Sequence, residues 1–154
     1  MDFEHEIFIA APPEAVWTRV MDLDRASEIM PVLESVELLD GGVYPGARVR
    51  VTVSAMGTRR SSEGRVTVLE PGRRLALEAE IPEVRASVTA EWKIRPEGAG
   101  SQVEQRISLK FKSTLARMAA QAMLRDGKAD AAARKGLAAL KIAVEAEAGA
   151  PASG

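Results

Sequence analysis

Apolar and polar residues alternate along much of the first two thirds of the chain, which is the period of half-buried β-strands. The pattern predicts a first strand over residues 3–10 and a second over residues 34–40. Two short helices are predicted between them, over residues 12–21 and 22–30. Prolines and Glu14 suit the start of the first helix, and a proline stops the second. The alternation then continues in further strands as an antiparallel meander.

The register of the meander follows from turns placed at Met56-Gly57, Pro71-Gly72 and Pro82-Glu83. One choice of register brings opposite charges together on the outer face and apolar residues together on the inner face. Such cross-strand pairs stabilise a sheet, and a slip by one residue would invert every face. The predicted partners are Arg50–Glu63, Val66–Leu77, Val68–Leu75, Leu77–Val88, Arg74–Glu91, Ala90–Ile107 and Trp92–Gln105.

The last third of the chain changes to the period of a helix with one buried face. Residues 113–125 are predicted to be helical, and a longer helix resumes near Lys128. Asp126-Gly127 either kinks one continuous helix or separates two. The predicted buried face is rich in small residues: Ala129, Ala133, Gly136, Leu137, Leu140 and Val144. Small side chains either bring a helix close to the sheet or leave space beneath it, and both interpretations stay open.

Composition narrows the function classes. The 154 residues carry a net charge of −1 with 28% charged residues, so the protein has no strong positive electrostatic field that would favour binding of nucleic acid. The chain has no cysteine, which excludes disulfides and thiol catalysis, and its single histidine, His5, disfavours a multi-histidine metal site. No apolar run approaches the roughly 18–20 residues of a membrane span, and the acidic start is unlike a signal peptide. We expect one cytoplasmic domain over residues 1–148, a disordered tail over 149–154, a monomer or weak dimer, and no metal or cofactor.

Short segments spread over the chain resemble one superfamily. They are Ile7-Phe8-Ile9-Ala10-Ala11-Pro12-Pro13-Glu14-Ala15-Val16-Trp17, Met21-Asp22-Leu23-Asp24, Met30-Pro31, Gly46, Trp92 and residues 137–141. The chain resembles the START-like, birch-pollen-allergen-like (SRPBCC) superfamily, in its bacterial polyketide cyclase/dehydrase and lipid-transport branch. The resemblance implies an α+β helix-grip fold. In that fold a curved antiparallel sheet of about seven strands wraps around a long C-terminal helix, with two short helices after the first strand. It also implies a deep apolar cavity between sheet and helix.

The predicted inner wall is nearly free of titratable side chains. Gln105 is the sharpest candidate, because an inward amide beside Trp92 needs a hydrogen-bond partner when it is buried. That partner is either a ligand or only the backbone or water. Cyclases of the resembling branch use an arginine in the cavity, but Arg65 is predicted to point outward and Arg60 lies near a strand end, so no catalytic residue is assigned. The candidate ligand-binding residues are Gln105, Trp92, Arg60, Ser62, Tyr44, Val51, Val66, Leu77, Val88, Ile107, Met118 and Leu137.

Three functions remain open at this point. The first is binding of a hydrophobic small molecule, such as a lipid, a quinone or a polyketide, in the cavity. The second is cyclisation or dehydration of a poly-β-keto chain, with Arg60 or Gln105 polarising a carbonyl. The third is a protein-interaction module, which predicts a filled core and a broad apolar surface patch.

Overall fold

The computed structural model describes residues 1–30, 33–55, 58–81 and 85–148. Its elements, in chain order, are β1 (Asp2–Ile9), α1 (Pro13–Met21), the 3-10 helix η1 (Leu23–Glu28), β2 (Leu33–Leu38), β3 (Arg48–Ala55), β4 (Thr58–Glu70), β5 (Arg74–Ile81), β6 (Ala86–Glu97), β7 (Gly100–Phe111), α2 (Thr114–Met123) and α3 (Lys128–Ala148). The strands form one antiparallel sheet in the order β1-β7-β6-β5-β4-β3-β2. This is the α+β helix-grip arrangement that the sequence predicts.

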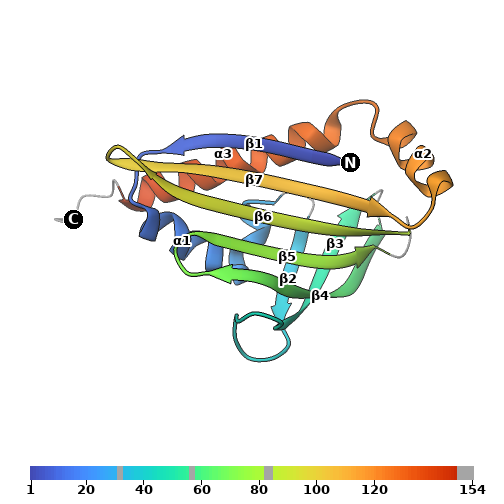
Figure 1. Ribbon diagram of the computed structural model, residues 1–154, viewed down its shortest axis with the longest axis horizontal. Helices are drawn as coiled ribbons and strands as arrows, with labels where there is room; N and C mark the ends of the chain where they lie inside the picture. Colours follow the sequence, from blue (N-terminus) through green and yellow to red (C-terminus); the bar gives the residue numbers. More distant parts are fainter. Residues whose placement is uncertain (31–32, 56–57, 82–84, 149–154) are drawn as a thin grey trace.

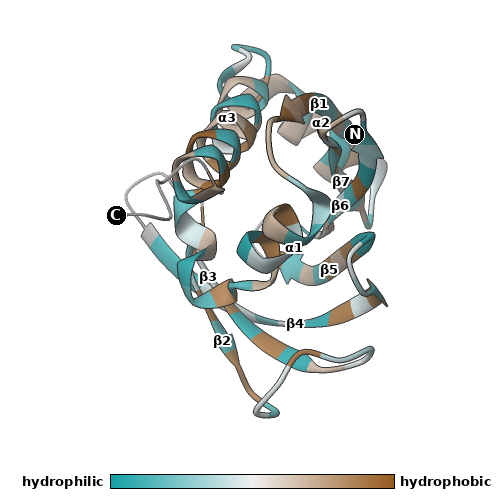
Figure 2. Ribbon diagram, turned by 90° about the vertical axis from the view of Figure 1, so that its left-hand side faces the viewer, coloured by the Kyte–Doolittle hydropathy of each residue, from teal (hydrophilic) through white to brown (hydrophobic). Residues whose placement is uncertain are grey.

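The sheet is strongly curved, and α3 lies along its concave side. Figure 1 shows β1 and β7 running beside α3, while β2, β3 and β4 turn away below them. Seen from the end in Figure 2, the sheet wraps from β1 around to β2, and α1 lies in the space that it encloses. α2 stands at the opposite end of the molecule from α1 (Figure 1). The curvature therefore leaves an interior between sheet and α3 that side chains must fill or line.

The predicted register is confirmed for most of the sheet. Arg50 lies opposite Glu63, and the β6–β7 pairing places Trp92 opposite Gln105. Val66 lies opposite Leu77, but a β-bulge follows, so the prediction that Val68 faces Leu75 is wrong and Val68 faces Ala76 instead. A bulge adds one residue to one strand and shifts the partners beyond it.

The predicted β5–β6 register is wrong by two residues. Leu77 lies opposite Ala90, not Val88, and Arg74 lies opposite Lys93, not Glu91. Because the shift is even, every side chain stays on its predicted face. Arg74 still reaches Glu91 diagonally, with Nε 2.7 Å from a carboxylate oxygen. The turn residues predicted at 56–57 and 82–83 and the tail at 149–154 lie outside the described residues.

The C-terminal third forms two helices. Ser113 caps α2, where its hydroxyl accepts a hydrogen bond from the Ala116 N–H at 3.1 Å. Gly127 takes a φ of 77° between the helices, a left-handed conformation that suits glycine. The predicted break at Asp126-Gly127 is therefore a separation and not a kink.

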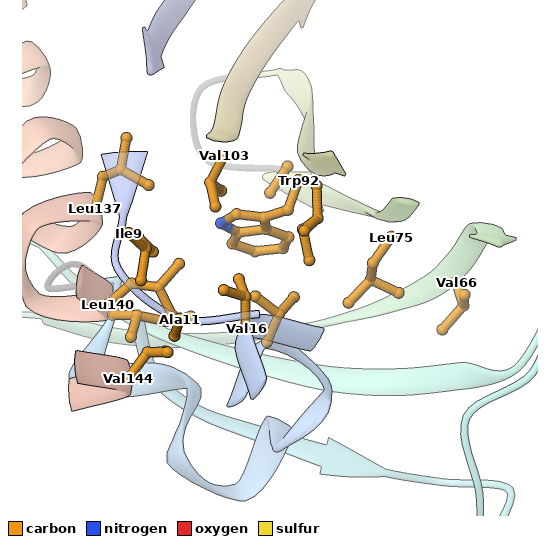
Figure 3. Packing of buried hydrophobic residues seen from close by; sticks show 14 of the residues in the cluster. Ile9, Ala11, Val16, Val66, Leu75, Trp92, Val103, Leu137, Leu140 and Val144 are labelled. Atoms are coloured by element: carbon orange, nitrogen blue, oxygen red, sulfur yellow. The ribbon is translucent and has the colours of Figure 1, made fainter. Parts of the chain in front are cut away.

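Large apolar side chains of α3 are buried toward its C-terminal half. Figure 3 shows Leu137, Leu140 and Val144 around Ile9, with the Trp92 indole to their right. These five residues are at most 2% exposed and belong to one cluster of buried side chains. Here α3 packs closely on the sheet, and the fold is anchored at this end.

Candidate functional site

A cavity of about 230 Å³ lies beneath the N-terminal half of α3 and is partly open to solvent. It is larger than an apolar cavity of about 150 Å³ that holds benzene, and smaller than the roughly 300–1,000 Å³ pockets of drug-sized ligands. Its lining is almost wholly apolar and comes from the strands, from the residues that follow η1, and from the α2–α3 region. The residues are Phe3, Ile29, Met30, Leu33, Val36, Val51, Val53, Leu77, Glu78, Ala79, Ile81, Val88, Ala90, Gln105, Ile107, Leu109, Leu124, Ala129, Ala132 and Ala133.

The cavity exists because side-chain size changes along α3. The first turns of the helix present Ala129, Ala132 and Ala133 to the sheet, and these methyl groups leave room beneath them. Two turns later, Leu137 and Leu140 fill the space between α3 and the sheet, and both side chains are at most 2% exposed. Both interpretations of the small-residue face thus hold, each in one half of the helix.

A buried polar chain forms the inner end of the cavity. Trp92 Nε1 donates to Gln105 Oε1 at 2.9 Å, and Gln105 Nε2 donates to the Ala133 carbonyl at 3.2 Å. Both side chains are 2% exposed. Gln105 therefore points inward as predicted, and its amide joins β6, β7 and α3. One lone pair of Oε1 and one N–H remain for a ligand.

Five of the predicted ligand-binding residues line the cavity: Val51, Leu77, Val88, Gln105 and Ile107. Three others, Trp92, Val66 and Leu137, are buried in the adjoining core and lie outside the cavity lining. Their ligand contacts stay predictions.

The remaining four candidates lie away from the cavity lining. Met118 is 61% exposed, because α2 turns it outward instead of toward the sheet. Tyr44 is 47% exposed in the segment between β2 and β3. Arg60 lies opposite Val53 as predicted, but its side chain is exposed near the strand end, and Ser62 is half-buried beside it.

Residues 1–145 match the family model described as "Polyketide cyclase / dehydrase and lipid transport". The chain belongs to this family. Three solved structures illustrate the likeness. A Deinococcus radiodurans protein from a structural genomics project has 25% sequence identity and a TM-score of 0.71, over 97% of this chain and 99% of that one. The di-domain aromatase/cyclase StfQ of the steffimycin biosynthetic pathway has 20% identity and a TM-score of 0.75, over 96% of this chain and 51% of that one.

The third structure is an aromatase/cyclase of a Streptomyces species, with 22% identity and a TM-score of 0.68, over 100% of this chain and 98% of that one. At such identities the two cyclases establish the fold alone. No curated protein sequence matches this chain. Membership of the family supports a hydrophobic-ligand-binding or polyketide-cyclase role, without deciding between them.

The cavity of this family member offers little acid–base chemistry. Of the described residues that line it, only Gln105 and Glu78 have polar side chains. Glu78 is exposed and lies between two lining residues of β5, so the alternation of the strand turns its carboxylate to the outer face. His5 is not part of this lining and lies beside α3, where its Nε2 approaches Asp130 Oδ1 to 3.0 Å without hydrogen-bond geometry. General acid–base catalysis needs a titratable group within hydrogen-bond reach of the substrate, and the lining of this cavity supplies none.

Titratable groups gather instead over the outer face of β1, β7 and β6. A second hollow of about 270 Å³ lies there, lined largely by charged residues. A hydrogen bond with Glu104 raises the pKa of Glu6 on the neighbouring strand, and the same bond lowers the pKa of Glu104, which Arg95 also approaches to 3.2 Å. These carboxyls pair with each other and with arginines across neighbouring strands. This face is therefore a solvent-exposed network of charged side chains.

Sequence reasoning missed the cavity residues that come from loops and element ends, such as Ile29, Leu33 and Leu124. It also missed Ser101, whose fully buried hydroxyl donates to the Ala11 carbonyl at 2.7 Å and ties β7 to the chain entering α1. No periodicity marks such residues, because their position depends on contacts between distant segments.

Within the described residues no helix is long and apolar enough to cross a membrane, and none of their His, Asp and Glu side chains form a group of three or more that could hold a metal ion.

Proposed function

We propose that this protein binds a small apolar molecule, of one or two rings or a short acyl chain, in the cavity beneath α3. The observation that carries the proposal is a cavity of about 230 Å³ with an almost wholly apolar lining. Burial of apolar surface supplies the affinity, roughly 25 cal/mol per Å² removed from water. Gln105 supplies the single polar contact, so a ligand with one carbonyl or hydroxyl group at its inner end fits best.

The size of the cavity disfavours a full-length poly-β-keto chain as the enclosed ligand. A folded chain of several ring equivalents exceeds a space only moderately larger than a benzene-sized cavity. Cyclisation also requires that carbonyls be polarised at several defined positions, and Gln105 offers the cavity only the one N–H and one Oε1 lone pair that its bonds to Trp92 and Ala133 leave over. Cyclase activity remains the second candidate, because the fold is shared with aromatase/cyclases.

A matched pair of α3 variants tests the proposal. Ala132 lines the cavity, whereas its neighbour Ala131 is exposed. Ala132→Phe places a ring in the cavity, and Ala131→Phe places the same ring in water. Naphthalene and 1-naphthol serve as probes, and the rise of Tm with probe concentration reports binding to the folded state. We expect the rise for the wild type and Ala131→Phe, and at least about a tenfold weaker response for Ala132→Phe.

Equal responses from all three proteins, or no response from the wild type, would overturn the proposal. Native mass spectrometry of the protein purified from its own host, followed by lipid extraction, identifies the natural ligand. A reconstitution with a poly-β-keto thioester separates the two candidates. A product distribution that changes with the wild type but not with Ala132→Phe would assign a cyclase.

A further inference from the structure

The short helix α2 presents an apolar stripe to solvent. Leu115, Met118 and Met123 are 78%, 61% and 55% exposed, and they stand on one side of the helix together with Ala119 and Ala122. Half of the large apolar side chains that are exposed among the described residues stand on this ten-residue helix. A surface helix normally turns such a stripe toward the core, and a cluster of exposed apolar side chains marks an interaction surface.

The opposite side of α2 explains why the helix is oriented this way. Ala116, Ala120 and Leu124 face the rest of the protein, and Ala120 is the buried residue of the helix. Two of these three are alanines, so α2 rests on the molecule through its smaller side chains. Its larger apolar side chains are left for a partner.

The segment that contains α2 carries a net positive charge. Residues 110–135 contain seven Lys and Arg against two Asp, a net charge of +5 in a chain whose net charge is −1. Arg117 and Arg125 are exposed, and the ion pairs that the described residues of this segment form leave both without an acidic partner. This end of the molecule therefore combines an exposed apolar stripe with a net positive charge.

The end of α2, on the side opposite the stripe, adjoins the cavity. Leu124, the residue that follows α2, and Ala129, in the first turn of α3, both line it. Figure 1 shows α2 projecting from the end of the sheet where β7 finishes, away from the tightly packed end of α3. A partner seated on α2 would thus lie beside the cavity.

We propose that the α2 stripe docks on an anionic lipid membrane and that Arg117 and Arg125, which are exposed in the same segment, contact its headgroups. This inference rests on the proposed function, because a membrane is where an apolar ligand dissolves and from where it could enter the cavity. Leu and Met side chains of an interfacial helix insert at the boundary of headgroups and acyl chains, and basic residues contact anionic headgroups. A projecting helix suits a fluid lipid surface, whereas a protein partner would have to supply a groove for it.

Vesicle flotation tests the apolar contact. The wild type is mixed with vesicles of phosphatidylcholine alone or of phosphatidylcholine with phosphatidylglycerol. We expect it to float with the anionic vesicles and to be released as salt rises, because salt screens exposed charges. Leu115→Gln with Met118→Gln should weaken the partition about tenfold. The control is Ile142→Gln, since Ile142 is 71% exposed on α3 outside the stripe, and it should float as the wild type does.

A second pair tests the charge. Arg117→Gln with Arg125→Gln should also weaken partition about tenfold and flatten its salt dependence. Arg73→Gln is the control, because Arg73 is exposed at the β4–β5 turn, the end of the sheet remote from α2. Circular dichroism confirms that each variant is folded, as expected for changes at exposed positions. Equal flotation of both double variants and their controls would overturn the proposal.

The same proteins titrated with naphthalene in the absence of vesicles keep the two proposals apart. Naphthalene binding without flotation overturns membrane docking and leaves the cavity function standing. Flotation without naphthalene binding supports docking and contradicts the cavity function. Sedimentation that shows a dimer, dissociated by Leu115→Gln with Met118→Gln, together with absent flotation, would assign the stripe to a second copy and overturn the proposal.

Discussion

Replacement of Gln105 by leucine should lower the stability of the protein measurably. From the sequence alone this change leaves the fold intact and shifts ligand preference away from oxygenated molecules, because the two side chains have similar volumes. The structure adds a cost to stability. Leucine removes the acceptor of the Trp92 indole N–H and the donor to the Ala133 carbonyl, at 2.9 and 3.2 Å.

The magnitude follows from burial. Trp92 and Gln105 are each 2% exposed, so water does not reach the indole N–H once its acceptor is gone. An unsatisfied buried donor costs about 1–3 kcal/mol. The Ala133 carbonyl still accepts a hydrogen bond from the backbone N–H four residues later in α3. Losing the bond from Gln105 Nε2 therefore costs little at this carbonyl. With a Tm change of about 2–4 °C per kcal/mol for a chain of this size, Tm should fall by about 2–12 °C.

Equilibrium urea unfolding followed by circular dichroism measures the effect without depending on tryptophan fluorescence. Gln102→Leu is the matched control, because Gln102 lies on the same strand with the opposite parity. Trp92→Phe removes the donor itself. In the double variant Trp92→Phe with Gln105→Leu the penalty should be shared, with a coupling energy of about 1 kcal/mol. Additive losses, or a Gln105→Leu midpoint equal to that of Gln102→Leu, would refute the hydrogen-bonded chain.

Three further changes have defined outcomes. A hydrogen bond from the Ala10 N–H at 2.8 Å lowers the pKa of Glu145, so its stabilisation is full above the unfolded value of about 4.3 and is lost as pH falls through the lower folded value. Glu145→Gln should therefore lower the urea midpoint at pH 7, and the difference from the wild type should disappear only once the pH is below the lowered folded pKa of Glu145. Ser101→Ala removes a buried 2.7 Å hydrogen bond and should cost about 1–3 kcal/mol in urea unfolding. Gly64→Ala would drive a methyl group against a backbone carbonyl of β5, so we expect a loss of about 1–3 kcal/mol, and an unchanged Tm would contradict the contact.

The sequence by itself determined the parts of this protein that depend on local period and on turn chemistry. Alternation assigned each residue to a face of the sheet, and the register that pairs Ala90 with Ile107 placed Trp92 opposite Gln105. Asp126-Gly127 marked the position at which the C-terminal helical stretch is kinked or divided, and the structure shows two helices there. These features rest on interactions between neighbours in sequence, or on hairpins whose register the turn fixes.

Only the tertiary structure decided where space remains. The bulge after Val66 and the two-residue shift between β5 and β6 depend on how neighbouring strands fit the curvature of the sheet. Met118 belongs to an apolar stripe whose period predicts burial, yet nothing within the described residues covers it. A cavity is a difference between the space that the backbone encloses and the side chains that enter it. Elements from β1 to α3 contribute to that difference at once, so no single stretch of sequence contains it.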